Sequence, residues 1–518
     1  MGPKGSKSSP ALCRKHSWSS SFQGEADLAH GRESGNRKRR GLESVSLGGT
    51  DLTFNSLGFL LFFTVVLAVD LLLRHQGRGR KPFLLIASWF FYACWDWRFL
   101  ALILFSTGLD FLVGTKIHGT ENPKRRRAWL YASLVGNLGI LGTFKYYDFF
   151  AESLAEWTGA NLPLLDIALP IGISFYTFQT LSYTLDIYRK ELTPTKSFSD
   201  FALFVAFFPQ LVAGPIVRAK EFLPQLRPGV SRPNSSKIQE GLSDILIGLF
   251  KKVVIADTIG RGIGDPFFAN PDAYGTLGAI CAIYAVAFQF YGDFDGYSRI
   301  AIGCGKMLGF ELPENFRSPF TSRTMIDLLR RWHITLSTWM RDYLYFPLGG
   351  NRCSPKRALF NVAATMFLVG LWHGAGWNFP IWGLLLGLGL MVSHLRENAR
   401  KANGVQLSNS PIAILFQRAC VFNYWCLVGV FFRAPTFPEA MDVFSSLLRG
   451  LSGHFEPLHA FLTTLCLAWF CISARPDQWV GEKLNRLSPE FQGAILVLLL
   501  GFIAAVQTSA TPFIYFQF

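Results

Sequence analysis

The sequence predicts an all-α protein that is embedded in a membrane. Half of its 518 residues are hydrophobic, and the mean hydropathy is +0.27. The apolar residues fall in blocks of roughly 17 to 22, which is the length that crosses a bilayer as a helix. The strands of a membrane barrel would instead be about 10 residues long and would alternate in polarity. We therefore expect one polytopic domain of roughly a dozen spanning or re-entrant helices.

Residues 1–50 differ from the membrane domain that we expect at 51–518. They are rich in Ser and Gly, carry a basic run at 37–40 and show no periodic apolar pattern. This composition is typical of a disordered tail. A tail that touches anionic lipid and a misassigned start, with translation beginning near residue 42 or 45, are the alternatives. No signal peptide is expected, because no apolar core precedes Phe54, which opens a full-length span.

The expected spans follow the apolar blocks in chain order. They lie near 55–73, 82–95, 98–115, 129–146, 167–187, 200–217, 241–257, 275–291, 295–310, 358–373, 376–395, 412–431, 457–475 and 491–510. Basic loops at 74–81 and 116–127 are separated by two spans and therefore share one side of the membrane. The positive-inside rule makes that side cytoplasmic.

Segment 313–357 is the largest polar interruption in the second half of the chain. Nothing from residue 324 to 346 breaks a helix, and Pro347 with the two glycines that follow ends it. Apolar residues spaced three or four apart give this helix one apolar face. It is too charged to span, so it should lie at the interface or dip into a protein-lined cavity. His333 stands next to that face and could point inward.

A second histidine, His373, stands in the sequence LWHGAGWN at 371–378, between two apolar runs. A buried ionisable group at membrane depth is costly, so by default it marks a functional site. Histidine also suits a general base near neutral pH. The adjacent glycines allow a substrate or another backbone to come close, and the two tryptophans can wall a pocket. A packing histidine bonded to a helix carbonyl is the alternative.

Several familiar sites are absent from the sequence. There is no G-x-S-x-G, H-E-x-x-H or G-x-x-x-x-G-K-[ST] motif. The nine cysteines form no C-x-x-C pair, so neither a disulfide framework nor a metal site is indicated. The net charge of +15 mostly reflects cytoplasmic loops and is weak evidence for nucleic-acid binding.

A histidine without a local nucleophile suits acid/base work on an external hydroxyl that attacks an activated acyl group. Nearby Arg and Lys could hold an anionic donor or acceptor.

Other polar residues inside the apolar blocks have simpler interpretations. Gln179 and Gln210 are expected to make helix–helix hydrogen bonds, with tunnel lining as the alternative. Asp293 and Asp295 interrupt the run at 275–310, where they would cap a helix or line the cavity. Lys251 and Lys252 are expected to extend to the membrane interface, with binding of CoA phosphates as the minority alternative.

A series of short motifs carries a resemblance to a known family. They are Phe90–Trp95 (FFYACW), Leu169–Gln179 (LPIGISFYTFQ), Phe208–Ile216 (FPQLVAGPI), Tyr291–Ser298 (YGDFDGYS), Arg330–His333 (RRWH), Leu371–Gly374 (LWHG) and Phe432–Ala434 (FRA). In this order they resemble the membrane-bound O-acyltransferases, in the AlgI-type branch of alginate O-acetylation that also includes the D-alanyl transfer protein DltB. The similarity covers the chain from Phe54 to its last residues.

The resemblance implies a ring of tilted helices around a thin, funnel-shaped centre, with a tunnel near His373. It also implies acetyl-CoA as the acyl donor substrate, with no permanently bound cofactor and no metal. His373 would be catalytic, and His333 would orient the acceptor or relay a proton. Supporting or tunnel-lining residues would be Trp332, Trp372, Asn378, Arg331, Asp342 and Gln179.

The resemblance further implies a multi-pass protein of the bacterial inner membrane, in contact with lipid and not with nucleic acid. It would move acetyl groups outward, through a periplasmic partner that resembles the SGNH hydrolases, to an exported polysaccharide such as alginate. D-alanyl transfer to teichoic acid and O-acetylation of peptidoglycan are alternatives within the family. A non-enzymatic polysaccharide transporter is the alternative outside it, although no duplicated halves are visible in the sequence.

Overall fold

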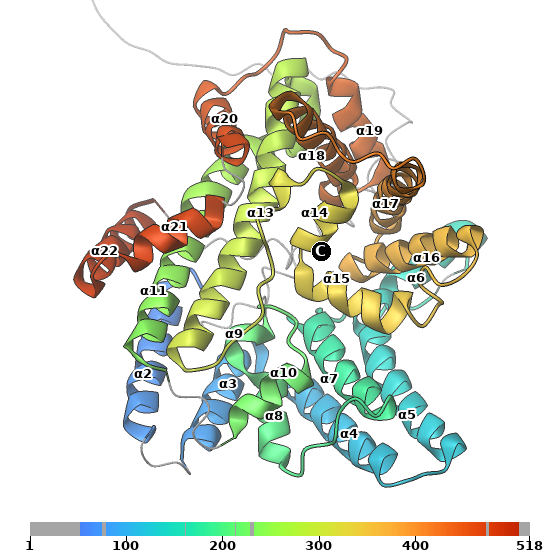
Figure 1. Ribbon diagram of the computed structural model, residues 1–518, viewed down its shortest axis with the longest axis vertical. Helices are drawn as coiled ribbons and strands as arrows, with labels where there is room; N and C mark the ends of the chain where they lie inside the picture. Colours follow the sequence, from blue (N-terminus) through green and yellow to red (C-terminus); the bar gives the residue numbers. More distant parts are fainter. Residues whose placement is uncertain are drawn as a thin grey trace, which may run out of the picture. The chain divides into compact units, whose positions relative to one another are not determined.

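The structure is a computed structural model that describes residues 52–74, 79–160, 162–212, 214–227, 233–472 and 476–506. The expected tail at 1–50 and the end of the last expected span therefore lie outside the described residues. Within the described part the protein is all-α, as predicted (Figure 1). No β-strand forms there, and an isolated bridge joins Tyr274 and His454.

The helices follow one another with short connections. In chain order they are α2 (Leu57–Leu73), α3 (Arg80–Asp96), α4 (Leu100–His118), α5 (Pro123–Leu141), α6 (Tyr147–Thr158), α7 (Ile173–Tyr188), α8 (Phe198–Ala206), α9 (Phe208–Leu211), α10 (Ala219–Phe222), α11 (Ser235–Leu249), α12 (Asp265–Ala269), α13 (Thr276–Met307), α14 (Met325–Arg331), α15 (Ile334–Met340), α16 (Pro355–His373), α17 (Asn378–Ala402), α18 (Pro411–Arg433), α19 (Phe437–Ser446), α20 (Pro457–Ile472), α21 (Pro476–Asn485) and α22 (Pro489–Val506). The π-helical segments η2 (Gly142–Tyr146), η4 (Phe250–Asp257) and η8 (Arg341–Tyr345) extend α5, α11 and α15.

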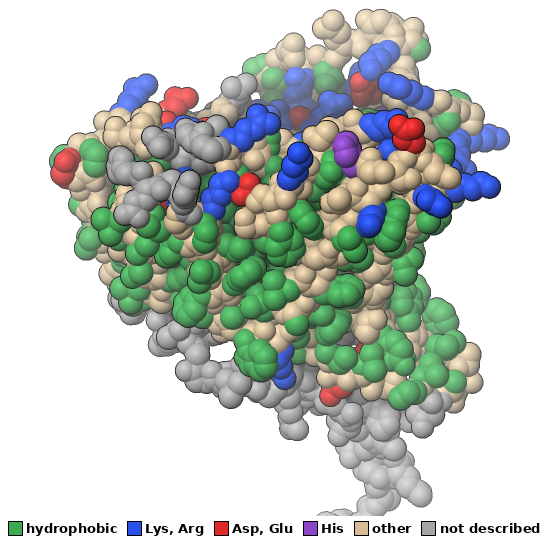
Figure 2. Space-filling view, turned by 90° about the horizontal axis from the view of Figure 1, so that it is seen from below, with side chains coloured by type: hydrophobic (Ala, Val, Ile, Leu, Met, Phe, Trp, Pro, Cys, Tyr) green, Lys and Arg blue, Asp and Glu red, His purple; other side chains and the backbone are tan. Residues whose placement is uncertain are grey.

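Several helical stretches suit a bilayer by length and composition. Among the described residues, the four longest apolar ones are Arg80–His118, Thr276–Met307, Asn378–Ala402 and Pro411–Arg433. Shorter apolar helices lie at Leu57–Leu73, Pro457–Cys471 and Pro489–Ile503. Figure 2 shows hydrophobic side chains over most of one face, with Lys and Arg gathered along one edge. An apolar band with a basic border is the surface expected of a membrane protein.

α13 runs through the middle of Figure 1 as one helix of 32 residues. The prediction of two spans with a break at Asp293 and Asp295 was therefore wrong. Both carboxylates are buried inside α13, where they pair with lysines of η4: Lys252 with Asp293 at 2.5 Å, and Lys251 with Asp295 at 2.5 Å. The lysines do not extend to the interface as expected. Each charge is stabilised by its partner, so the apolar run continues through them as a helix.

The close contact between α11 and α13 depends on small residues. A Cβ atom built on Gly248 would stand 2.6 Å from the carbonyl oxygen of Gly296, which is closer than real Cβ contacts come. The two backbones can therefore touch only because neither position carries a side chain. This approach brings η4 against α13 and lets the lysine side chains reach the aspartates.

Residues 200–217 do not form the span that was expected. They make two short helices, α8 and α9, which meet at Phe207, and Pro209 lies in the first turn of α9. From Phe201 onward the side chains of both helices are buried in protein. The apolar run therefore reflects burial among other helices and not contact with lipid, a distinction that a short run does not make by itself.

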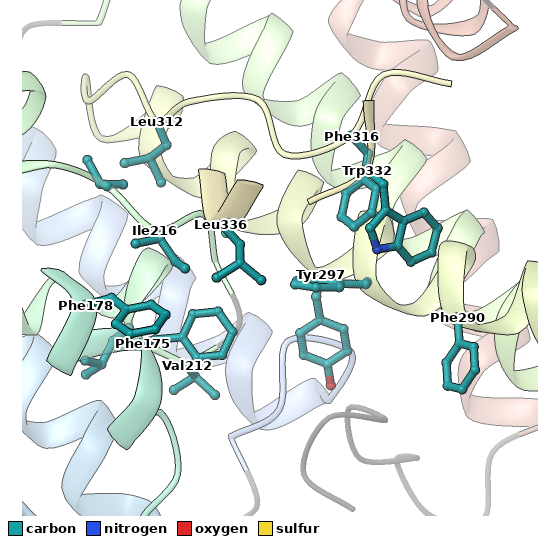
Figure 3. Packing of buried hydrophobic residues seen from close by; sticks show 14 of the residues in the cluster. Phe175, Phe178, Val212, Ile216, Phe290, Tyr297, Leu312, Phe316, Trp332 and Leu336 are labelled. Atoms are coloured by element: carbon teal, nitrogen blue, oxygen red, sulfur yellow. The ribbon is translucent and has the colours of Figure 1, made fainter. Parts of the chain in front are cut away.

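An aromatic core surrounds the centre of the membrane domain. In Figure 3, Phe175 and Phe178 of α7 lie on one side, Phe316 and Trp332 lie on the other, and Leu336 of α15 lies between them. All of these side chains are buried. The two candidate histidines lie in this core.

Candidate active site

The amphipathic helix predicted for 324–346 is interrupted at His333. α14 ends at residue 331, and α15 begins at residue 334. His333 itself has φ +43° and precedes α15 in a left-handed conformation. A non-glycine residue in this region is strained, and such residues cluster at functional sites. The expected inward orientation of His333 is observed, since the residue is only 2% exposed.

The interruption is caused by a second segment that pairs with the backbone on both sides of the histidine. The amide of Ile334 donates to the carbonyl of Asn315 at 2.8 Å, and the amide of Arg317 donates to the carbonyl of Arg331 at 2.9 Å. These two bonds use backbone groups that a continuous helix would pair internally. The left-handed turn at His333 lets both be made.

Asn315 also holds the His333 imidazole. Its side-chain oxygen lies 3.0 Å from Nδ1 of His333 and accepts from the Thr335 hydroxyl at 3.0 Å. Its side-chain nitrogen donates to the Ser298 hydroxyl at 3.1 Å. An amide oxygen can only accept, so Nδ1 must carry the proton and Nε2 keeps its lone pair. Asn315 could not be recognised from the sequence, because nothing in the chain marks a contact 18 residues away.

His373 is the last residue of α16 and is 5% exposed. Three aromatic rings meet its imidazole edge to face: Trp372 at 4.8 Å, Trp382 at 4.9 Å and Phe432 at 5.3 Å between centroids. The glycine after it is required by packing, because a Cβ on Gly374 would stand 2.1 Å from the ring of Phe379. The ring of Phe379 therefore packs directly on the backbone of the residue that follows the histidine.

Trp372 links the two histidines. Its ring centroid lies 4.8 Å from that of His373 and 6.2 Å from that of His333. Its indole N–H has no hydrogen-bond partner among the described residues, and neither has Nε2 of His333. The structure thus brings together His333, His373 and Trp372 from the predicted set.

A lysine that sequence analysis missed anchors this turn. Lys145, in η2, donates from Nζ to the carbonyls of Trp372 at 2.6 Å and His373 at 3.1 Å. The neighbouring Tyr146 hydroxyl donates to the carbonyl of Leu371 at 2.8 Å. The Lys145 side chain satisfies carbonyls at the carboxyl end of α16 that have no helical partner. A π-helical turn in this position is often found at functional sites.

The histidine turn lies well away from the basic ends of α5 and α7. Arg126, at the start of α5 in the predicted cytoplasmic loop, donates to the carbonyls of Ile187 and Tyr188 at the end of α7. From there to Phe178, which stacks on Trp372 at 5.3 Å, is about 15 Å along α7. Along α5, Lys145 lies about 28 Å from Arg126. Both lengths fall within a hydrocarbon core about 30 Å thick.

A polar cavity of about 550 Å³ opens at the basic end of α7. It is lined by Asp186, Arg189, Glu191, Arg218, Lys220, Asp342, Tyr343, Phe346 and Pro347. A series of ring contacts connects it to the histidines: Tyr343 lies 5.0 Å from Trp339, which stacks on Phe178 at 4.1 Å, which in turn stacks on Trp372. The cavity and the histidine turn are therefore the two ends of one aromatic column.

Asp342 lines this cavity with its charge compensated. Burial opposes its ionisation, but a hydrogen bond from Arg341 and an ion pair with Arg218 at 2.8 Å hold the pKa of the carboxyl below its usual value. The Arg218 guanidinium also lies over the ring of Tyr343, 5.2 Å from its centroid. Asp342 thus fixes Arg218 at the wall of the cavity.

The other predicted supporting residues lie farther from the histidines or make structural contacts. The ring of Trp332 packs on that of Trp425 at 4.5 Å. Arg331 pairs with Asp327 of its own helix at 2.9 Å, and Asn378 donates to the carbonyl of Ala434 at 2.9 Å. Gln179 is fully buried, and neither atom of its amide group has a partner among the described residues, so the expected helix–helix hydrogen bond was wrong.

Gln210 does make a hydrogen bond, from its side-chain nitrogen to the carbonyl of Phe204 at 2.5 Å. No group of three or more His, Cys, Asp or Glu side chains in the described part of the chain is placed to share a metal ion. The fold and the site together define a polytopic membrane protein with a histidine pair in its interior.

Comparison with known proteins gives the family. The model of the membrane-bound O-acyltransferase family, MBOAT, matches residues 185–432. A peptidoglycan O-acetyltransferase of Helicobacter pylori is 33% identical over 90% of this chain and 95% of its own length. A probable alginate O-acetylase AlgI of Pseudomonas putida is 36% identical over 90% of this chain and all of its own length. A teichoic acid D-alanyltransferase of Streptococcus thermophilus is 27% identical over 54% of this chain and 69% of its own length.

The chain therefore belongs to the membrane-bound O-acyltransferase family. It is a multi-pass membrane enzyme that transfers an acyl group to a hydroxyl. Its acyl donor is a substrate and not a bound cofactor.

Proposed function

We propose that this protein moves acetyl groups from cytoplasmic acetyl-CoA to the outer face of a bacterial inner membrane, for O-acetylation of an exported polysaccharide such as alginate. His373 takes the proton of the attacking hydroxyl as that hydroxyl adds to the thioester carbonyl. His333 orients the acceptor or relays its proton. The observation that carries the proposal is the position of the two histidines around Trp372, about 15 Å or more along the helices from the basic end.

The polar cavity supports access of the donor from the basic side. Arg189, Arg218 and Lys220 can bind the phosphates of CoA by charge-assisted hydrogen bonds. Tyr343 at the cavity is ten residues from His333, about 15 Å along a helix. A donor with a long, thin arm between its phosphates and its thioester suits this separation, and the stacked rings would form the wall along which the arm lies.

The space beside His373 supports a short acyl group. An apolar cavity of about 30 Å³ has Trp382 and Phe432 in its lining, and both rings contact His373. A volume of 10–15 Å³ by this measure holds about one water-sized group. There is room for the methyl group of an acetyl beside these rings.

The acceptor is proposed from the relatives. The AlgI protein of Pseudomonas putida is named for alginate acetylation and matches over its whole length. An acetyl group delivered at the outer face would pass to the polymer through a periplasmic partner that resembles the SGNH hydrolases. Acetylation of peptidoglycan is the second candidate, because the Helicobacter pylori relative with that name matches over 95% of its length.

The test is His373→Ala in a strain that lacks the chromosomal gene. Polymer acetylation should be lost while the variant still accumulates in the inner membrane and keeps the melting temperature of the wild-type protein. Retained acetylation would overturn the catalytic assignment. Acyl analysis of capsule and wall from the deletion strain separates alginate, peptidoglycan and D-alanyl acceptors. A transporter would show no release of CoA from acetyl-CoA in vesicles that contain the partner.

A further inference from the structure

Two buried hydrogen-bonding groups at the centre of the site have no partner among the described residues. One is the indole N–H of Trp372, and the other is Nε2 of His333. Their side chains are 6% and 2% exposed, and their ring centroids are 6.2 Å apart. Buried polar groups in proteins nearly always have a partner. Two such groups on neighbouring rings at the centre of the site call for a ligand that completes their hydrogen bonds.

The two groups have opposite hydrogen-bonding character. An indole N–H can only donate. Nε2 of His333 can only accept, because the proton of the neutral imidazole is on Nδ1, which donates to the side-chain oxygen of Asn315. The site therefore matches a ligand pair that offers one acceptor and one donor. A thioester carbonyl and an attacking hydroxyl offer one of each.

We propose that the N–H of Trp372 is a catalytic group that donates a hydrogen bond to the carbonyl oxygen of the acyl thioester. This rests on the proposed function, since it names a further residue of the same site. As the hydroxyl oxygen bonds to the carbonyl carbon, its proton passes to His373, directly or through His333, and the C=O electron pair moves onto the oxygen. The pair then re-forms the double bond, the C–S bond breaks, and the thiolate takes the proton from His373.

The hydrogen bond from the Trp372 N–H is strongest when negative charge develops on the carbonyl oxygen in the transition state. A preorganised N–H in a water-excluded site stabilises the oxyanion far more than the neutral carbonyl. The alternative is that the indole of Trp372 serves only for packing, since it stacks on Phe178 at 5.3 Å with 15° between the planes. Packing needs the rings and not the N–H, so the two interpretations predict different effects when only the N–H is removed.

The experiment replaces Trp372 by 3-benzothienylalanine, in which sulfur stands where the indole has N–H. CoA release from radiolabelled acetyl-CoA is measured in membrane vesicles that contain the partner, with deacetylated alginate as acceptor. We expect kcat to fall about 10²- to 10³-fold, as for loss of one oxyanion donor. KM for acetyl-CoA should change by less than about threefold, because ground-state binding uses this bond weakly. Trp372→Phe should show the same loss.

Trp377→Phe is the matched control, because Trp377 lies in the same turn as Trp372. Its indole N–H already donates to the Ser153 hydroxyl at 3.2 Å and is therefore not available to a ligand. This variant should keep kcat within about twofold. Wild-type kcat in the benzothienylalanine variant would overturn the proposal, as would a loss that appears only as a raised KM. Wild-type protein and His373→Ala are measured in parallel. If the wild-type protein releases no CoA, the proposed function fails. If the wild-type protein releases CoA and the benzothienylalanine variant releases it equally fast, only this inference fails.

Discussion

The side-chain oxygen of Asn315 lies 3.0 Å from Nδ1 of His333 and 3.0 Å from the Thr335 hydroxyl. The same residue accepts the amide of Ile334 on its main-chain carbonyl. Asn315 thus fixes both the left-handed backbone of His333 and the tautomer of its ring. A histidine whose lone pair must face one direction depends on such a partner, and loss of the partner commonly lowers activity.

We expect Asn315→Leu to lower kcat about 10- to 100-fold, because either ring nitrogen could then carry the proton. Asn315→Asp keeps an oxygen toward Nδ1 and should retain more activity than the leucine variant. Ser298→Ala removes only the outer contact of Asn315 and should cost less than about threefold. CoA release measures all three variants. Equal activity of the leucine and aspartate variants would show that the acceptor oxygen does not matter.

Lys145 gives the second prediction. Its Nζ donates to the carbonyls of Trp372 and His373, so Lys145→Met should release the end of α16 and displace the histidine. Removing one partner of a buried hydrogen bond costs about 1–3 kcal/mol, so the melting temperature should fall together with at least a tenfold loss of kcat. Arg126→Met is the control, because it removes the same kind of contact from the end of α7. Equal loss of activity in both variants would mean that only general stability is affected.

The fold was predictable where an apolar run is long and continuous. The expected spans at 358–373 and 412–431 correspond to α16 and α18. Both lipid-facing and core-facing residues are apolar there, so the whole helix appears as one apolar run in the sequence. The signal fails where polar groups pair across the chain. Lys251 and Asp295 are 44 residues apart, and nothing local shows that each neutralises the other inside the domain.

The site was half predictable for the same reason. His373 stands out because an ionisable group between apolar runs is rare, whereas His333 was singled out by its place beside the apolar face of a charged helix and by the family resemblance. The helix break at His333 cannot be recognised in the sequence, since no glycine or proline marks it. It is caused by backbone pairing with Asn315 and Arg317. Lys145 was read as part of a span, although it meets His373 from 228 residues away. Tertiary contacts of this kind require the structure.

The polar cavity gives a prediction about donor binding. If Arg218 binds a phosphate of CoA, Arg218→Met should raise KM for acetyl-CoA about 10-fold or more while kcat changes little, because a charge-assisted bond to the bound donor is lost. Arg341→Met is the matched control. That side chain also pairs with Asp342 but does not line the cavity. If KM rose equally in both variants, the cause would be the lost ion pair with Asp342 and not a lost contact with the donor.

The low pKa of Asp342 predicts how stability depends on pH. Burial opposes its ionisation, but Arg341 and Arg218 outweigh burial and lower the pKa in the folded protein. The pKa of the unfolded chain is about 3.9, so the stabilisation is full above that value and is lost as pH falls through the folded pKa. Asp342→Asn should therefore melt lower than wild type at pH 7, and the difference should shrink below about pH 4. A difference that stays constant to pH 3 would contradict this.

The buried pair of Lys251 and Asp295 gives the last prediction. The ions are 2.5 Å apart, with side chains that are 8% and 3% exposed. Lys251→Met leaves the carboxylate buried without its nearest cation, so the free energy of unfolding should fall by about 3–5 kcal/mol. The double variant Lys251→Met/Asp295→Asn should recover most of this loss, because no uncompensated charge remains and Arg299 keeps its pair with Asp244 at 3.1 Å.

Denaturation in detergent measures each unfolding free energy, and the exposed pair Lys401–Glu397 supplies the comparison. Lys401→Met should cost less than about 1 kcal/mol, since solvent screens that pair. If the double variant were as unstable as Lys251→Met alone, the lysine would stabilise the fold by packing, and the charge pairing between η4 and α13 would not be the reason that the helix continues through Asp295. Recovery in the double variant would show instead that the two charges are tolerated in the membrane domain because each compensates the other.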